Sequence, residues 1–161
     1  MRLKIYVAGQ ITGLTLPEIQ SYFNTTGDKL RAWNYRVFLP LTDAEALKNG
    51  FTSDEVFKSS GYKGNPLTED KAIFRRDIWM VRQADIVLCN LNTKNNHVSI
   101  GCTVEIAHAH AYGKHVVTVI DNTDNPHHHA FILQCSDVVF PTLDEALEYL
   151  KDYSSDIDIR K

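Results

Sequence analysis

Short apolar runs alternate along the chain with longer segments in which apolar residues recur every three or four positions. The short runs, bounded by turn residues, predict buried strands, and the longer periodic segments predict amphipathic helices. Strands are predicted at residues 3–8, 35–39, 85–91, 115–120 and 138–140. Helices are predicted at residues 16–33, 69–83, 99–112, 129–135 and 143–153. We expect Gly27 to weaken or interrupt the first of these helices, and we expect a short helical turn at 43–48.

This order of elements predicts a single doubly wound α/β domain, Rossmann- or flavodoxin-like, with a mostly parallel five-stranded sheet. The domain is expected to span residues 1–153, followed by a polar tail at 154–161. Ligands of such sheets bind beyond the carboxyl ends of the strands. The site is therefore expected in the loops that follow Ala8, Leu39, Leu91 and Ile120.

Composition and charge narrow the classes of partner. The chain has 161 residues, of which 43% are hydrophobic and 23% charged, as in ordinary globular domains. Its 17 basic and 20 acidic side chains give a net charge of −3, which argues against a nucleic acid polymer as partner but allows a local site for one small anion. No apolar run reaches the roughly 18 residues of a membrane-spanning helix, and the N-terminal residues lack the apolar stretch of a signal peptide. We therefore expect no membrane partner.

Cysteine and histidine usage gives no metal site. Cys89, Cys102 and Cys135 are too few and too widely spaced for a disulfide framework or a zinc site. Buried free thiols are typical of a reducing compartment, so we expect the protein in the cytoplasm. The consecutive histidines at 127–129 cannot all face one point. They are expected to lie in a solvated loop or to contact phosphate or a neighbouring subunit.

Residues capable of chemistry gather at the start of the helix predicted at 99–112. Ser99 and Gly101 stand near its N-terminus, where free backbone N–H groups and the helix dipole favour an anion. Glu105 follows about a turn and a half later, next to Ile106 and a series of alanines. From spacing alone, Glu105 is either an ordinary exposed residue or a carboxylate that faces the cleft at the strand ends.

A second carboxylate, Asp77, follows Arg75 and Arg76 on the helix predicted at 69–83. Taken alone, it is expected at the surface or in a salt bridge, and the nearby Trp79 is expected in the core. The residues expected to point inward from this helix are Ile73, Ile78 and Val81. Two carboxylates in one cleft, however, can supply a nucleophile and an acid or base at a glycosidic carbon.

Three segments resemble, in the same order, segments of nucleoside 2-deoxyribosyltransferases: KIYVAGQITG, FRRDIWMVRQADIVLCNL and SIGCTVEIAHAHAYGKHVVTVI. The third is the most specific, with a glycine, a Glu-Ile pair and an alanine-rich helix that ends in Gly-Lys. The resemblance spans about residues 3–150, and the region 42–68 fits it poorly. The chain is also similar to the related 2′-deoxynucleoside 5′-monophosphate N-glycosidases.

The resemblance implies an enzyme that cleaves the N-glycosidic bond of a 2′-deoxynucleoside or its 5′-monophosphate. It implies that Glu105 is the nucleophile that forms a covalent deoxyribosyl ester, that Asp77 moves a proton at the base, and that Tyr6 lies near the nucleophile. The ester would pass to a free nucleobase or to water, and the residues leave both outcomes open. A nucleotide-binding sensor without turnover is a further alternative. No cofactor is implied, and a homo-oligomer, a dimer or larger, is expected.

The residues expected to bind substrate lie in the loop after the first strand and around the helix at 99–112. They are Gly9, Gln10, Ile11, Gly13, Ser99, Gly101 and His129. The two-glycine loop is not the dinucleotide-binding fingerprint, and a plain strand-to-helix turn is an equally good interpretation of it. Glycines at such a place allow the backbone to approach a ligand closely.

Two positions depart from the transferase pattern. Transferases of free nucleosides commonly have Asp six positions before the nucleophile, where this chain, like the monophosphate glycosidases, has Ser99. An Asp would repel a 5′-phosphate, whereas a Ser at a helix N-terminus can donate to it. His129 stands where the family has an Asn or Ser from a neighbouring subunit, and a protonated His could pair with phosphate. Several transferases also end in an aromatic residue, which residues 156–161 lack.

Overall fold

The computed structural model describes residues 2–40, 56–58 and 69–159. Within these ranges five parallel strands form one sheet in the order β2-β1-β3-β4-β5. The strands are β1 (Lys4–Gly9), β2 (Arg36–Phe38), β3 (Ile86–Asn90), β4 (His115–Val119) and β5 (Val138–Phe140). The predicted five-stranded doubly wound α/β fold is therefore confirmed.

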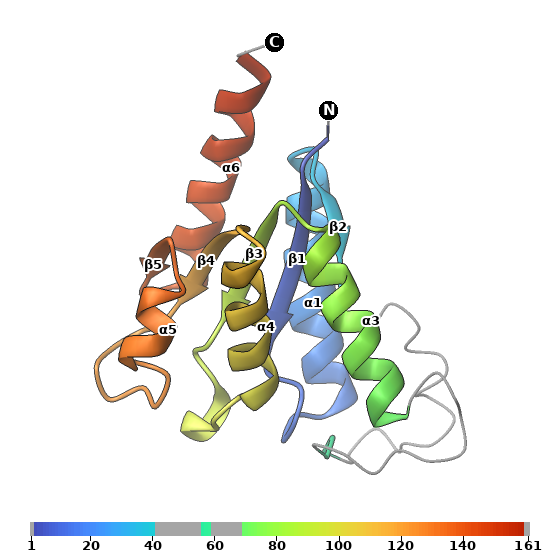
Figure 1. Cartoon of the computed structure of the whole chain (residues 1–161), viewed down its shortest axis with the longest axis vertical. Coiled ribbons are helices and arrows are strands. Elements are labelled where there is room, and N and C mark those ends of the chain that lie inside the picture. Colours follow the sequence, from blue (N-terminus) through green and yellow to red (C-terminus); the bar gives the residue numbers. More distant parts are fainter. Residues whose placement is uncertain (1, 41–55, 59–68, 160–161) are drawn as a thin grey trace.

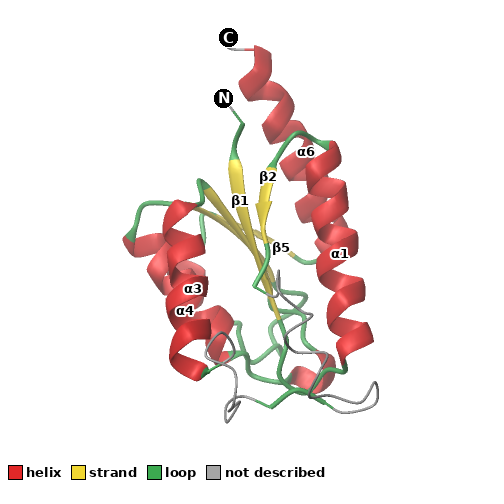
Figure 2. Cartoon of the chain, turned by 90° about the vertical axis from the view of Figure 1, so that its right-hand side faces the viewer, coloured by secondary structure: helices red, strands yellow, loops and turns green. Residues whose placement is uncertain are grey.

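Helices cover both faces of the sheet, as Figure 2 shows. One layer contains α1 (Leu16–Ala32) and α6 (Leu143–Ile159), and the other contains α3 (Asp70–Gln83), α4 (Ile100–Ala111) and α5 (Ala130–Gln134). Side chains of β1 alternate between the two layers, because successive residues of a strand point to opposite faces. Ile5 and Val7 pack into the core beneath α1 and α6, whereas Tyr6 and Ala8 pack into the core beneath α3 and α4.

The strand register brings the carboxyl ends of the central strands to one edge of the sheet. Gly9 of β1 pairs with Asn90 of β3, and Asn90 pairs with Val119 of β4. Strand β2 pairs with one side of β1, and β3 pairs with its other side. The direction in which strands are added to the sheet therefore reverses between β1 and β3, which is the topological switch point. The loops that follow these strands, including the short helix η1 (Lys94–Asn96), gather at the lower end of the molecule in Figure 1.

Several elements differ in detail from the sequence prediction. Helix α1 is continuous through Gly27, which is buried. A Cβ at Gly27 would lie 3.1 Å from Arg31 Nη1 and 3.4 Å from Leu39 Cδ1, so this glycine serves close packing and does not break the helix. Helix α6 continues past residue 153 to Ile159, since each residue added to a formed helix gains a backbone hydrogen bond. The turn expected at 43–48 lies outside the described residues.

The inward face of α3 is also different from the predicted one. Asp77, Met80 and Val81 are buried, at the i, i+3 and i+4 spacing of a single helix face. Ile73 and Ile78 are only half-buried. The expectation that Trp79 lies in the core is wrong, because its neighbours Asp77 and Met80 occupy the inward face and Trp79 is 56% exposed.

Candidate active site

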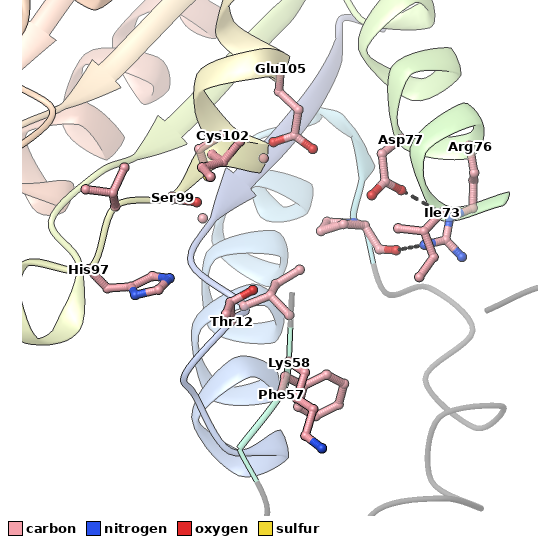
Figure 3. A pocket seen from close by; sticks show the side chains of 16 residues that line it. Thr12, Phe57, Lys58, Ile73, Arg76, Asp77, His97, Ser99, Cys102 and Glu105 are labelled. Atoms are coloured by element: carbon pink, nitrogen blue, oxygen red, sulfur yellow. Dashed lines mark hydrogen bonds and ion pairs between the residues drawn. The ribbon is translucent and has the colours of Figure 1, made fainter. Parts of the chain in front are cut away.

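A cavity of about 550 Å³ opens at the switch point, between the β1–α1 loop, α3 and the N-terminal end of α4 (Figure 3). Phe57 and Lys58 close one side of it, and Phe57 is tied to the loop after β1: Gly13 N–H donates to Phe57 O at 2.8 Å, and Phe57 N–H donates to Leu14 O at 2.9 Å. The described side chains with polar atoms that line the cavity are Thr12, Lys58, Arg76, Asp77, His97, Ser99, Cys102 and Glu105. Two carboxylates, supplied by two facing helices, thus share one cavity.

Glu105 of α4 is held by a tyrosine from the sheet. The Tyr6 hydroxyl donates to Glu105 Oε1 at 2.6 Å, and Tyr6 itself is fully buried. Burial raises the pKa of Tyr6 well above its usual value, with the Glu105 and Asp77 charges adding to the effect, so the phenol keeps its proton and can donate it to the Glu105 carboxylate. Glu105 is half-buried, and Figure 3 shows its carboxylate facing the cavity. The bond to Oε1 leaves Oε2 unoccupied by Tyr6.

Asp77 of α3 faces the same cavity and is held by its neighbour. Arg76 Nε donates to Asp77 Oδ1 at 3.2 Å, while Arg76 Nη2 donates to Pro40 O at the end of β2. Asp77 is only 9% exposed, because it lies on the inward face of α3. Burial raises the pKa of Asp77 to about 6, and the charge and hydrogen bond of Arg76 act in the opposite direction.

The electrostatics of the two carboxylates are linked. Burial raises the pKa of Glu105 well above its usual value, the neighbouring Cys102 and Asp77 raise it further, and the Tyr6 hydrogen bond lowers it. Both carboxyl groups therefore hold protons at a pH at which exposed carboxylic acids have lost theirs. Such a pair can combine one ionised and one protonated member, the arrangement needed for a nucleophile and an acid in one site.

The N-terminal end of α4 forms the third wall. Ser99 is the N-cap residue, and its carbonyl oxygen accepts from Thr103 N at 3.1 Å and from Thr103 Oγ1 at 3.0 Å. Ser99, Ile100 and Gly101 all line the cavity, so the first turn of a twelve-residue helix is directed at it. Helix N-termini attract anions through their free N–H groups and dipole. Lys58, Arg76 and His97 add basic side chains to the same lining.

The loop after β1 is shaped by its glycines and by Gln10. A Cβ at Gly9 would lie 2.5 Å from Tyr22 Cε1, so only glycine fits under this ring. Gly13 has φ +82, a conformation that strains other residues. Gln10 is buried, and both ends of its amide are hydrogen-bonded: Oε1 accepts from Lys94 N at 2.8 Å and Nε2 donates to Thr12 O at 2.9 Å. Gln10 thereby ties the loop after β1 to η1.

The structure brings together most, but not all, of the residues singled out from the sequence. Those that line the cavity are Gly9, Ile11, Asp77, Ser99, Gly101 and Glu105. Tyr6 lies directly behind Glu105. Gln10 and Gly13 support the loop from outside the described lining, and His129 is exposed at the N-cap of α5, where its Nδ1 accepts from Phe131 N.

Several residues of the site were not singled out by the sequence. Arg76, His97 and Lys58 line the cavity, and His127 holds Ser99 from behind, with its Nε2 accepting from Ser99 N at 2.8 Å. Arg76 could have been found, because it directly precedes the carboxylate on α3. Lys58 and His97 lie in irregular segments, where no periodicity indicates direction. In the histidine run at 127–129, nothing in the sequence distinguishes the buried His127 from its exposed neighbours.

The parts of the chain that the structure describes contain neither a candidate membrane span nor a candidate metal site. No helix there is long and apolar enough to cross a bilayer. No group of three His, Cys, Asp or Glu side chains there is placed to hold a metal ion. Cys89, Cys102 and Cys135 are free thiols.

The fold and the cavity define a doubly wound α/β protein that carries two carboxylates in one cavity at the carboxyl ends of its strands. The model of the family described as nucleoside 2-deoxyribosyltransferase matches residues 5–150. The chain therefore belongs to the nucleoside 2-deoxyribosyltransferase family, as the resemblance of its motifs implied. No curated protein is significantly similar to the chain in sequence.

Solved structures with the same fold include two transferases and a glycosidase. A 2-deoxyribosyltransferase from Leishmania mexicana has a TM-score of 0.63 at 16% identity, covering 93% of this chain and 97% of that one. The 2-deoxyribosyltransferase from Bacillus psychrosaccharolyticus has a TM-score of 0.60 at 17% identity, covering 91% of each chain. The CMP N-glycosidase BcmB from Clostridium botulinum has a TM-score of 0.50 at 14% identity, covering 93% and 98%. At these identities the likeness concerns the fold.

Proposed function

We propose that the protein cleaves the N-glycosidic bond of a 2′-deoxynucleoside or its 5′-monophosphate and transfers the deoxyribosyl group to a second nucleobase through an ester on Glu105. The observation that carries the proposal is the placement of Glu105, which is bound by Tyr6 and faces a cavity that it shares with Asp77. Membership of the family supports the same chemistry.

In the first step Glu105 Oε2 attacks C1′ of the sugar. The C1′–N bond breaks as the C1′–O bond forms, and the electron pair of the broken bond passes to the base nitrogen. Asp77, in its protonated form, donates a proton to the leaving base, for which its pKa of about 6 is suitable. The positive charge that develops at C1′ favours the ionised form of Glu105, and the Tyr6 hydrogen bond favours it further.

In the second step the ester is released to an acceptor. A nitrogen of a second base attacks C1′, the C1′–O bond to Glu105 breaks with its electron pair returning to the carboxylate, and the proton displaced from the acceptor passes to Asp77. The covalent ester divides one difficult substitution into two easier ones. It also retains the sugar while the bases exchange.

Hydrolysis of a 5′-monophosphate is the second candidate, and Ser99 favours it. Transferases of free nucleosides commonly have an Asp at this position. This chain has the neutral Ser99 there, at the N-terminal end of α4. Lys58 lines the same cavity and adds a positive charge that suits a phosphate. Water would then take the place of the second base. We infer that a 5′-phosphate, if present, lies against Ser99 and the first turn of α4.

The experiment is incubation with each 2′-deoxynucleoside and each 2′-deoxynucleoside 5′-monophosphate, with and without a second base, followed by chromatography of the bases and sugars. Transfer gives a new nucleoside only when the second base is present, and hydrolysis gives free base and free sugar. Glu105→Gln should abolish both, whereas Glu148→Gln, on the exposed side of α6, should have no effect. Normal turnover by Glu105→Gln would refute the mechanism. Binding of these compounds without turnover by the wild-type protein would indicate the sensor alternative.

We also propose that the protein forms a homo-oligomer in the cytoplasm. The side chain of Phe131 on α5 is 79% exposed, and His129 lies beside it at a ring-centroid distance of 5.5 Å. An exposed aromatic side chain next to a candidate phosphate ligand suits a subunit contact that completes a neighbour's site. Sedimentation velocity of wild type and Phe131→Ser tests this, and a monomeric wild-type protein would contradict it.

A further inference from the structure

A buried pair of polar residues lies behind the N-terminal end of α4. Asn125 is 4% exposed and His127 is 1% exposed, both in the loop between β4 and α5. His127 Nε2 is 2.8 Å from Ser99 N, and His127 Nδ1 is 3.0 Å from Asn125 Oδ1. His127 is not among the described residues that line the cavity, and its hydrogen bond to Ser99 connects it to the site.

The surrounding hydrogen bonds fix the position of the proton on the imidazole ring. Asn125 Nδ2 donates to Leu91 O at 3.0 Å and to Asp121 Oδ1 at 3.1 Å, which are both acceptors. The amide oxygen of Asn125 is therefore the atom that faces His127, and it can only accept, so Nδ1 must carry the proton. The backbone N–H of Ser99 can only donate, so Nε2 must be without one. The ring is neutral, with a single allowed tautomer.

This ring joins two loops that are far apart in the sequence. The backbone N–H of Ser99, at the start of α4, has no partner within the helix, and its environment is partly buried. A partner outside the helix therefore stabilises it. His127 supplies that partner from the loop between β4 and α5. The orientation of Ser99, and with it the first turn of α4 at the cavity, thus depends on an acceptor outside the helix.

We propose that His127, as the neutral Nδ1–H tautomer, is a positioning residue that holds Ser99 in the orientation in which the cavity binds the sugar or phosphate end of the substrate. If Nε2 were protonated, its N–H would face the N–H of Ser99, and two donors cannot form a hydrogen bond. The contact that holds Ser99 would then be lost. The catalytic part of this inference rests on the proposed function, whereas the tautomer and the Ser99 contact do not.

The charges around the ring favour the neutral form. His97, in the loop before α4, is the described titratable group whose charge acts on the ring, and it opposes a second positive charge. Burial and His97 lower the pKa of His127, and the carbonyl oxygen of Leu91 acts against them. Asp121 contacts the Asn125 amide instead of the ring. Release of Ser99 is therefore expected only below the usual pKa of histidine.

Two substitutions separate the functions of the two ring nitrogens. His127→Gln places an amide oxygen near the position of Nε2 and keeps an acceptor for Ser99 N–H. His127→Asn keeps a donor near the position of Nδ1 and removes that acceptor. The control is His128→Gln, one residue further along, whose side chain is exposed.

The first measurement is independent of turnover. Nitrogen-15 shifts of the wild-type imidazole should show the Nδ1–H tautomer at pH 7.5, and the Ser99 amide should be protected from hydrogen exchange. In His127→Asn this amide should exchange at least tenfold faster, while His127→Gln and His128→Gln should exchange as the wild type does. An Nε2–H tautomer, or an unchanged Ser99 exchange rate in His127→Asn, would overturn the proposal. The tautomer test needs no variant, so a variant that fails to fold leaves it decisive.

The second measurement uses whichever 2′-deoxynucleoside or monophosphate is turned over. His127→Asn should raise KM about tenfold with kcat changed by less than threefold, and His127→Gln should restore KM. The increase in wild-type KM at acid pH should be absent from His127→Gln. Equal losses of kcat in both variants, with KM unchanged, would refute a positioning role. If no compound is turned over, the proposed function fails, while the exchange experiment still decides the contact with Ser99.

Discussion

Replacement of Tyr6 by Phe tests how the sheet controls Glu105, the proposed nucleophile. The change removes the phenolic oxygen of a fully buried side chain. This oxygen donates a hydrogen bond to Glu105 Oε1 at 2.6 Å. Hydrogen bonds to charged groups contribute about 1.5–3 kcal/mol, which corresponds to a loss of about 10- to 100-fold in kcat/KM. The bond lowers the pKa of Glu105, so its removal raises that pKa, and the acid limb of the pH profile should move to higher pH.

The assay is kcat/KM for release of free base between pH 4 and pH 9, measured for wild type, Tyr6→Phe and a matched control. Tyr22→Phe is the control, because it removes the same atom from a tyrosine that donates to Ala8 O, at the end of the same strand, and not to Glu105. The control should change kcat/KM by less than about threefold. An unshifted acid limb in Tyr6→Phe, or equal losses in both variants, would show that Tyr6 does not tune Glu105.

Three further predictions concern the supporting groups. Because burial raises the pKa of Asp77 from 3.8 to about 6, its contribution to stability is fully present below pH 3.8 and is lost as the pH rises through 6. The free energy of unfolding of the wild-type protein in urea should therefore fall by on the order of 3 kcal/mol over this pH range, relative to that of Asp77→Asn. If the free energies of the two proteins changed with pH in parallel, burial would not raise the pKa of Asp77. Arg76→Gln should raise the pKa of Asp77 and move the alkaline limb of kcat to higher pH; a shift to lower pH would contradict the assigned pairing. Gly9→Ala should destabilise the fold by about 1–3 kcal/mol, since the added Cβ would meet the Tyr22 ring. Gly101→Ala has open space around its Cβ and should change stability by less than about 1 kcal/mol. Equal effects of the two variants in urea unfolding would contradict the close approach of Gly9 to Tyr22.

The fold was largely predictable because its strands are short apolar runs between periodic helices. The pattern failed where a polar residue lies on an inward face. Asp77 was expected at the surface or in a salt bridge; it does form an ion pair with Arg76, but it lies on the inward helix face with Met80 and Val81. Trp79 was expected in the core because it is large and hydrophobic, but it is exposed. Gly27 looked like a helix breaker because a sequence does not show that Leu39 packs against it.

The carboxylates of the site were predictable from motifs, whereas their support was not. Tyr6 contacts Glu105 across 99 positions of the chain, and such a pairing depends on the sheet register and the packing of α4. His127 is likewise set by the buried network around Asn125. Local periodicity carries no information on either contact, so these residues could be assigned only once the fold was known.

The most direct test of the central claim is the capture of the ester on Glu105. Wild-type protein, mixed with a substrate and quenched in acid within the first turnover, is digested and its peptides are weighed by mass spectrometry. The account predicts a deoxyribosyl adduct on the peptide that contains Glu105, and no adduct in Glu105→Gln. An adduct on any other residue, or none in a protein that releases base with retention of configuration at C1′, would contradict it.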